Sequence, residues 1–179
     1  AKEAGIRLIV GTRLDLKDAP SLLCFPTDRA AYGRLCRLLS LGQGRAIKGQ
    51  CTLHLADVAA FASGQIFVML PPDDSTTLES ALKRLKSALS TSPLYLAASH
   101  LYRGNDRARI AALMEASQRC GTQLVATNDV LYHTSQRRPL QDVLTCVREH
   151  TVIEEAGFLL EANAERHLKS PGEMELLFA

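Results

Sequence analysis

The residues most suited to chemistry are Asp129 and His133, which follow a short apolar run at residues 124–126. The run, Leu-Val-Ala, has the composition of a strand buried on both faces, and the Thr-Asn-Asp that comes next is typical of a loop that ends a strand. Ligand groups gather at the carboxyl ends of strands when strands and helices alternate along a chain. We therefore expect any chemistry of this chain, metal binding included, to lie in this loop.

The same residues also have structural interpretations. Asp129 can cap the turn after its strand through hydrogen bonds from its side chain to the backbone. His100 follows a second apolar run, at residues 94–98, but His100 and His133 stand in different loops. Two histidines in separate loops are a weak indication of a metal site, because partly exposed loop histidines are common.

The elements that position these loops are expected to alternate between strands and helices. Apolar runs predict strands at residues 6–10, continued with alternation to 16, and at 65–70, 94–98 and 124–126, with 21–25 pairing back as an antiparallel neighbour. Helices are expected at residues 28–42, capped by Thr27 or Asp28, and at 55–62, 76–89, 106–120 and around 140–147. This alternation predicts an α/β architecture with parallel strands, too few to close a barrel.

Helical spacing also predicts which side chains face the core. The expected inward positions are Tyr32, Leu35, Leu38 and Leu39; Ile110, Leu113, Met114 and Ser117; and Leu140, Val143, Leu144 and Val147. Thr76 with Glu79, and Ser170 with Glu173, have the spacing of capping boxes. Residues 43–51 are rich in glycine and basic, which is typical of a mobile surface loop, and residues 151–160 are weakly patterned.

Composition limits the class of protein. The chain has 179 residues and is 46% hydrophobic, enough for one sizeable core. Because 21 Lys and Arg balance 19 Asp and Glu, the whole-chain charge gives no argument for nucleic acid or a membrane surface. Five cysteines without CxxC spacing favour buried free thiols in a reducing cytoplasm. The chain starts at Ala1 in what reads as the end of a helix, so we expect a piece of a longer protein.

Four segments spread over nearly the whole chain carry a resemblance to a known family. They are LIVGTRLDL, TDRAAYGRLCRLLSLGQGRAIKGQ, LVATNDVLYHTSQRRPLQDVLTCVREHTVIEEAG and NAERHLKS. These segments resemble the polymerase-and-histidinol-phosphatase (PHP) domain at the front of bacterial DNA polymerase III alpha subunits, in its error-prone, damage-inducible branch. The resemblance implies a distorted, TIM-like (βα)7 barrel with a metal cluster at the carboxyl ends of its strands. Residues 1–179 would then be a single PHP-domain fragment that lacks the first two βα units, with 170–179 starting the next helical segment.

Compared with that family, this chain departs from the metal pattern. Arg13 stands where the family has a glutamate, Tyr102 where it often has a histidine, and Leu131 where its aspartate-x-histidine motif has the histidine. A cation at a ligand position repels a metal, and leucine has no lone pair to donate. The resemblance therefore implies a degenerate metal site in which Asp129 is the remnant and His100 and His133 are weaker candidates.

Arginines are the other residues of interest in this region. Arg13 could pair with Asp15, with Asp129 or with a backbone carbonyl, so that a guanidinium takes the place of the lost cation. Arg137 and Arg138 read either as a solvated helix start or as contacts for phosphate.

Two functions from different classes follow from the resemblance. In the first, the chain is a non-catalytic platform within an error-prone DNA polymerase whose catalytic carboxylates lie elsewhere. The fragment would need no cofactor, whereas the parent would need Mg²⁺ and would contact DNA. Its partners would be the other domains of the parent, and replication or translesion proteins are further candidates; we also expect self-association through an exposed apolar edge. The alternative is a metal-dependent phosphoesterase or 3′–5′ exonuclease, which needs His or carboxylate at positions 13, 102 and 131. A third reading, an unrelated α/β binding domain, requires the matching segments to be accidental.

Overall fold

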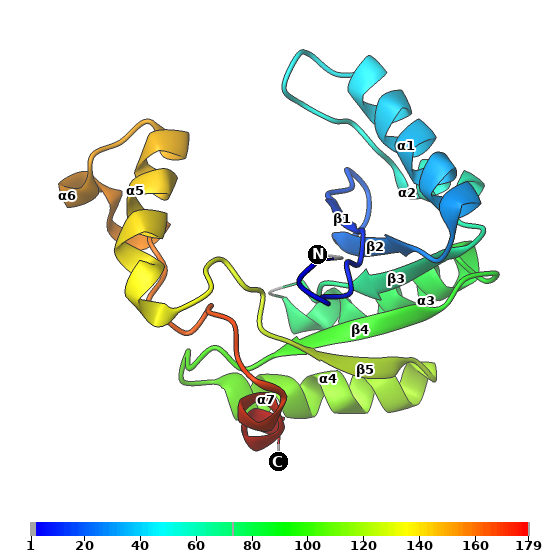
Figure 1. The fold of residues 1–179 in the computed structure, drawn as a ribbon. Coiled ribbons are helices and arrows are strands. Elements are labelled where there is room, and N and C mark those ends of the chain that lie inside the picture. The colour runs from blue at the N-terminus through cyan, green and yellow to red at the C-terminus, as the bar shows by residue number, and fades with distance from the viewer. Residues whose placement is uncertain (1–2, 73, 179) are drawn as a thin grey trace. The chain divides into compact units, whose positions relative to one another are not determined.

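The computed structural model describes residues 3–72 and 74–178, which fall into two compact units. Unit 1 comprises Ala1–Ala97 and Leu113–Val125, and unit 2 comprises Ala98–Ala112 and Ala126–Ala179. The helices are α1 (Arg29–Gly44), α2 (Leu55–Ala60), α3 (Leu78–Ala88), α4 (Asp106–Cys120), α5 (Arg138–Glu149), α6 (Ile153–Ala156) and α7 (Pro171–Phe178) (Figure 1). Short 3-10 turns occur at Ser75–Thr77, Ser135–Arg137 and Gly157–Leu159.

The five strands form one open, mixed sheet. They are β1 (Thr12–Leu14), β2 (Leu22–Pro26), β3 (Gln65–Met69), β4 (Leu94–Ser99) and β5 (Gln123–Thr127), in the order β1-β2-β3-β4-β5. β1 with β2 and β2 with β3 pair antiparallel, whereas β3 and β4 are parallel, with Val68 opposite Tyr95. The predicted α/β class and the antiparallel partner at residues 21–25 are therefore confirmed, and the expected parallel sheet is in fact mixed.

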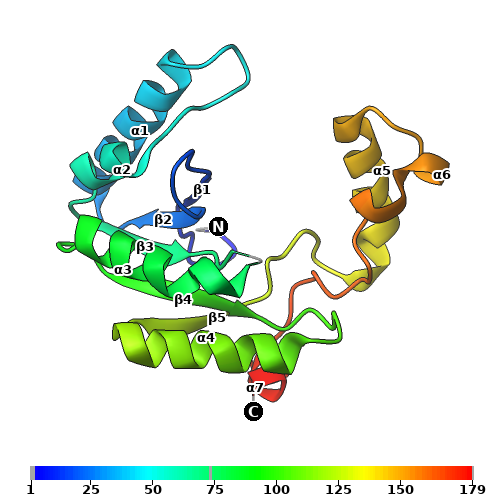
Figure 2. The ribbon, with the colours of Figure 1, turned by 180° about the vertical axis from the view of Figure 1, so that it is seen from behind.

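Unit 1 contains the larger core. In the part of the chain that the structure describes, all the largest fully buried side chains belong to it, among them Phe67, Met69, Leu82 and Leu96. α1 contacts β2, α2 contacts α3, and both views place α3 beside β3 and β4 (Figures 1 and 2). Apolar burial of this kind is the main force that holds such layers together.

A polar residue in this core is accommodated by specific partners. The amide nitrogen of Gln65, which is 2% exposed, donates to the carbonyl of Ala31 at 2.8 Å, and the Cys24 thiol donates to its amide oxygen at 3.4 Å. Burial raises the pKa of Cys24 to about 12, so the thiol stays protonated. Cys24, Cys120 and Cys146 are buried and free, as expected, but Cys36 is half-buried and Cys51 is exposed.

The helix ends lie where the sequence predicts them when the prediction depends only on adjacent residues. The carboxylate of Asp28 accepts from the Ala31 N–H at 2.7 Å at the start of α1, and the capping box of Ser170 and Glu173 forms at α7. α4 covers the predicted residues 106–120, and Gly121 follows it with φ of +59°. The capping box expected for α3 is wrong: Asp74 accepts from the Thr76 N–H at 2.9 Å, and a 3-10 turn leads into the helix.

Several predictions of burial are wrong. Residues 6–10 form no strand and are exposed, and no strand among the described residues pairs with them. β5 is the last strand of the sheet and is only partly buried, and the inward positions Tyr32 and Met114 are each 48% exposed. Residues 151–160, expected to be irregular, include α6 and a 3-10 turn, and α1 extends to Gly44, into the expected loop.

The stripe predicted on α5 is also exposed. Its side chains lie at helical spacing as expected, but their exposed fractions are 53% for Leu140, 50% for Val143, 54% for Leu144 and 68% for Val147. Within the described residues no helix is long and apolar enough to cross a membrane.

Candidate functional site

The candidate site of unit 2 is built from two loops and one long-range segment. The loops follow β4, at residues 100–105, and β5, at residues 128–134. Residues 161–169, which we call the strap, bind both loops through the contacts described below.

The strap fixes the loop after β5 through an asparagine and a short backbone ladder. The Asn128 amide donates to the carbonyls of Glu165 at 2.8 Å and His167 at 2.6 Å. The Leu131 N–H donates to the carbonyl of Arg166 at 2.8 Å, and the Leu168 N–H donates to the Tyr132 carbonyl at 3.1 Å. The strap therefore pairs with this loop much as a strand would.

The strap fixes the loop after β4 through a second asparagine. The Asn163 amide donates to the Leu101 carbonyl at 2.7 Å, and its oxygen accepts from the Glu165 N–H at 2.9 Å. Arg103 lies 3.6 Å from the carboxylate of Glu161. Both loops are thus attached to the same nine residues.

Asp129 is paired with a guanidinium of the strap. Nε of Arg166 donates to the Asp129 carbonyl at 2.8 Å, and the two remaining nitrogens of Arg166 bind the carboxylates of Asp129 and Glu161. The side chains of Arg166 and Glu161 are 14% and 28% exposed and that of Asp129 is 53% exposed, so water screens the Arg166–Asp129 pair more than the Arg166–Glu161 pair. Arg13 is not the partner of Asp129. Its Nε instead donates to the carboxylate of Asp15 at 2.7 Å in unit 1.

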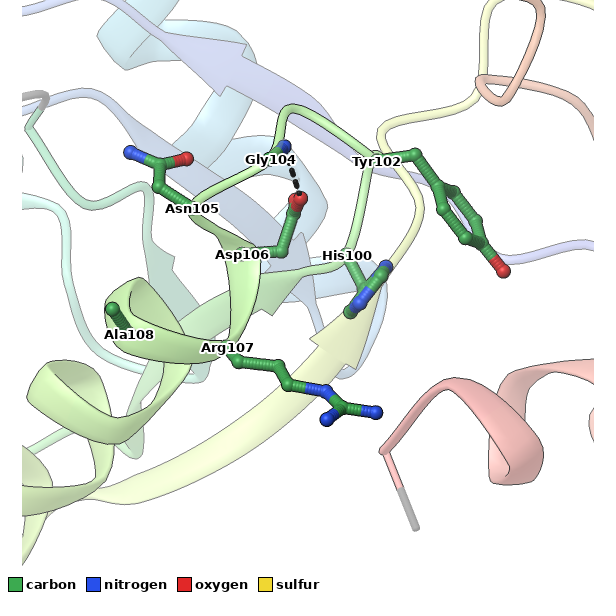
Figure 3. Close-up of a pocket in the computed structure, with 7 residues that line it drawn as sticks. All are labelled: His100, Tyr102, Gly104, Asn105, Asp106, Arg107 and Ala108. Atoms are coloured by element: carbon green, nitrogen blue, oxygen red, sulfur yellow. Dashed lines mark hydrogen bonds between the residues drawn. The ribbon is translucent and has the colours of Figure 1, made fainter.

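Asp106 organises the loop after β4 from the first turn of α4. Its carboxylate accepts backbone N–H groups of Leu101 at 2.8 Å, Arg103 at 2.6 Å and Gly104 at 3.2 Å, and Figure 3 shows it turned toward this loop. Burial by itself would raise the pKa of Asp106, but the hydrogen bonds from Leu101 and Arg103 and the nearby His100 outweigh it. The pKa therefore lies below its ordinary value of 3.8.

His100 lines a hollow of about 500 Å³ beside Asp106, together with Tyr102, Gly104, Asn105, Arg107 and Ala108 (Figure 3). Nδ1 of His100 is buried and has no hydrogen-bond partner within the described residues, and its ring meets the Tyr102 ring edge-on, with centroids 4.7 Å apart. His133 is exposed. No group of three or more His, Cys, Asp or Glu side chains in the described ranges is arranged to hold a metal ion.

Two non-glycine residues of these loops have left-handed backbones. φ is +54° at Tyr102 and +43° at Asp129. Aspartate adopts this conformation readily, but for a tyrosine it costs about 1–3 kcal/mol of backbone strain. The contacts of Asp106 and Asn163 around Tyr102 supply the hydrogen bonds that hold it there.

Sequence reasoning identified the two loops but missed the residues that hold them. The spacing of these residues along the chain indicates no shared site: Asp129 and Arg166, for example, are 37 residues apart. The residues are Asn128, Glu161, Asn163 and Arg166. Arg138, expected to be solvated or to bind phosphate, instead donates to the Glu161 carbonyl within unit 2.

Comparison with known proteins finds relatives that match nearly the whole chain. A Caulobacter vibrioides protein named error-prone DNA polymerase is 53% identical over 182 residues, covering 99% of this chain and 16% of that protein. Error-prone DNA polymerases of Rhodopseudomonas palustris (49%) and Agrobacterium fabrum (48%) match 96% and 100% of the chain, and again 16% of their own length. The chain is homologous to one segment of the error-prone DNA polymerases. No family model matches it. The segment thus spans 16% of the error-prone polymerases that it resembles.

Replacing Arg166 with methionine should loosen the strap. The Arg166→Met change leaves the carboxylates of Asp129 and Glu161 without their shared cation, so we expect a loss of about 1–3 kcal/mol in the free energy of unfolding. Hydrogen exchange at the Leu131 and Leu168 N–H groups should accelerate at the same time. Arg148→Met, at a side chain 67% exposed, is the control and should stay within about 0.5 kcal/mol. Equal effects of the two changes would contradict the role given to Arg166.

Asp106→Asn should alter the dependence of stability on pH. A carboxyl group whose pKa is lowered by folding stabilises the fold above its unfolded pKa, about 3.9, and loses that contribution as pH falls through the folded value. We expect the variant to be less stable by about 1–3 kcal/mol at pH 7, with the difference shrinking below about pH 4. Urea unfolding at several pH values measures this, and Glu115→Gln, on the exposed side of α4, controls for loss of a carboxylate. A constant difference from pH 7 to pH 3 would refute the assignment.

Proposed function

We propose that this chain is the PHP-type part of an error-prone DNA polymerase and serves there as a platform on which other domains of the parent pack. The observation that carries the proposal is the exposed stripe of α5, made of Leu140, Val143, Leu144 and Val147. Four branched apolar side chains on one helix face cost free energy in water, at about 25 cal/mol per Å², unless something covers them. The relatives, of which the chain spans 16%, contain ample further protein to do so.

Neighbouring residues of unit 2 extend this surface. Val152 and Ile153 at α6 are 54% and 48% exposed, and Phe158 and Leu159 in the following 3-10 turn are fully and 55% exposed. Aromatic and branched side chains of this kind form the centres of stable interfaces. A surface of this composition fits the apolar face of another domain better than it fits DNA.

The same proposal includes a degenerate metal site, in which positions that hold metal ligands in the resembling family carry other residues. Arg13, Tyr102 and Leu131 stand at three positions where the resembling family has metal ligands, and Arg166 provides a permanent cation for Asp129. An open sheet with unpaired residues 6–10 fits a barrel that lacks its first two units. Catalysis, dependence on Mg²⁺ and contact with DNA are then properties of the parent polymerase.

Substitution on the stripe tests the platform. Val147→Ser should change the stability of the isolated chain by less than about 0.5 kcal/mol, because the side chain is exposed there. In the full-length polymerase the same change should cost about 1–2 kcal/mol, seen as a lower melting temperature and faster proteolysis, because a buried apolar group is lost. Ile47→Ser, at a side chain 72% exposed in unit 1, is the matched control. A full-length polymerase indifferent to Val147→Ser and Leu144→Ser would rule out this surface as the platform.

Metal content tests the second part. After dialysis against metal-free buffer, the chain should hold less than about 0.1 Zn²⁺ or Mn²⁺ per molecule by elemental analysis, because too few ligands converge. A sample first loaded with Zn²⁺ and then dialysed controls for loss of a native ion. One or more retained ions per chain would instead support the metal-dependent phosphoesterase or 3′–5′ exonuclease.

A further inference from the structure

A small cavity lies in unit 1 where α3 and α4 end. It has a volume of about 110 Å³, and its polar lining residues are Lys86, Ser90, Ser92 and Thr122. Leu89 and Leu94 supply apolar walls. The lining contains one basic residue and no acidic one, so the cavity is suited to a polar occupant that accepts hydrogen bonds.

The hydroxyl of Thr122 is a buried polar group without a partner. Thr122 is 6% exposed, and its Oγ1 has no hydrogen bond within the described residues. The backbone of Thr122 is satisfied, because its N–H donates to the Ser117 carbonyl at 3.0 Å and its carbonyl accepts from the Ser117 hydroxyl at 2.5 Å. A buried hydroxyl that lacks a partner is unfavourable, so an occupant that accepts its hydrogen bond is favoured.

Lys86 brings a positive charge to the same cavity. Its Nζ donates to the carbonyls of Cys120 at 2.7 Å and Gly121 at 2.8 Å, and an ammonium group has one further N–H to give. The hydroxyl of Ser92 donates to the Ala62 carbonyl at 2.7 Å, whereas the hydroxyl of Ser90 has no hydrogen bond among residues 3–72 and 74–178. Lys86, Ser90 and Thr122 therefore each have a donor that the described chain does not use.

The two helix ends limit the charge of an occupant. The C-terminal end of a helix carries a partial negative charge, about half a unit. Some of its carbonyls are already bonded here: Gln118 accepts from the Gly121 N–H at 3.2 Å, and Leu89 accepts from the Ser92 N–H at 3.0 Å. Because the helix ends still oppose any anion, the single charge of a carboxylate fits better than the double charge of a phosphate.

We propose that this cavity binds one carboxylate group, supplied by a small organic acid or by an Asp or Glu side chain of a protein segment. The two oxygens of a carboxylate accept several hydrogen bonds, so one group can satisfy Lys86, Ser90 and Thr122 together. A cavity of about 110 Å³ admits a group of this size. The proposal does not rest on the platform role, because the cavity belongs to unit 1 and the α5 stripe to unit 2.

The test is a titration of the ¹⁵N-labelled 179-residue chain with sodium acetate, with sodium chloride keeping the ionic strength constant. The amide signals of Ser90 and Gly121 should shift and saturate with a Kd of about 10 mM, a weak affinity that reflects three hydrogen bonds opposed by two helix ends. A capped Gly-Glu-Gly tripeptide is titrated in parallel. Tighter binding of acetate would identify a free acid as the occupant, and tighter binding of the tripeptide would identify a protein side chain.

Two substitutions test the donors. Thr122→Val keeps the shape of the side chain and removes the hydroxyl, so the Kd for acetate should rise about tenfold. The fold tolerates this change, because the hydroxyl has no partner in the described chain. Ser90→Ala should raise the Kd about threefold, since Ser90 is exposed and water competes for its hydroxyl. Thr91→Val is the matched control: Thr91 is exposed, adjoins Ser90 and is not part of the lining, so the variant should bind acetate as the unaltered chain does.

Three results would overturn the proposal. They are the absence of saturable shifts up to about 200 mM acetate, the same Kd in Thr122→Val as in the unaltered chain, and tighter binding of inorganic phosphate than of acetate. The first result would mean that the cavity holds only water. Because the readout is acetate binding in unit 1, failure here leaves the platform proposal unaffected, and a polymerase indifferent to Val147→Ser would leave this proposal unaffected.

Discussion

The loops of unit 2 depend on one interaction, the guanidinium of Arg166 between the carboxylates of Asp129 and Glu161. Two carboxylates held near each other repel, and the repulsion grows as water is excluded. A metal ion is one solution to that problem and a half-buried arginine is another, with the difference that a guanidinium has no open coordination position for water or substrate. Asp129 therefore acts as a structural partner of Arg166, and this pairing fixes the geometry of its loop.

Hydrogen bonds between the strap and the two loops add to the attachment that Arg166 provides. The Asn128 amide and the Leu131 N–H bind its backbone, and Asn163 reaches back to the Leu101 carbonyl. Because these are backbone partners, the attachment depends on the path of the strap more than on its side chains. It is also what allows Tyr102 and Asp129 to keep left-handed backbones, a conformation that a free loop would relax.

The sequence predicted features set by near neighbours and failed on those set by distant ones. The Asp28 cap, the Ser170 capping box and the limits of α4 each need only a few adjacent residues, and all three are observed. The burial of β5 depends on whether another strand lies beyond it, and the partner of Asp129 is 37 residues away. Periodicity gives the spacing of the α5 stripe correctly but says nothing of what covers it. The same limit explains why the sequence indicates Arg13, and not Arg166, as a candidate partner of Asp129.

Residues 6–10 and the α5 stripe have one physical property in common. Both have the pattern of buried segments, and both are exposed in the described chain. Isolated exposed apolar residues are ordinary in soluble proteins, but a helix face with four of them at helical spacing is not. An apolar face is stabilised by removing water from it, so residues 6–10 and the α5 stripe both call for an apolar occupant.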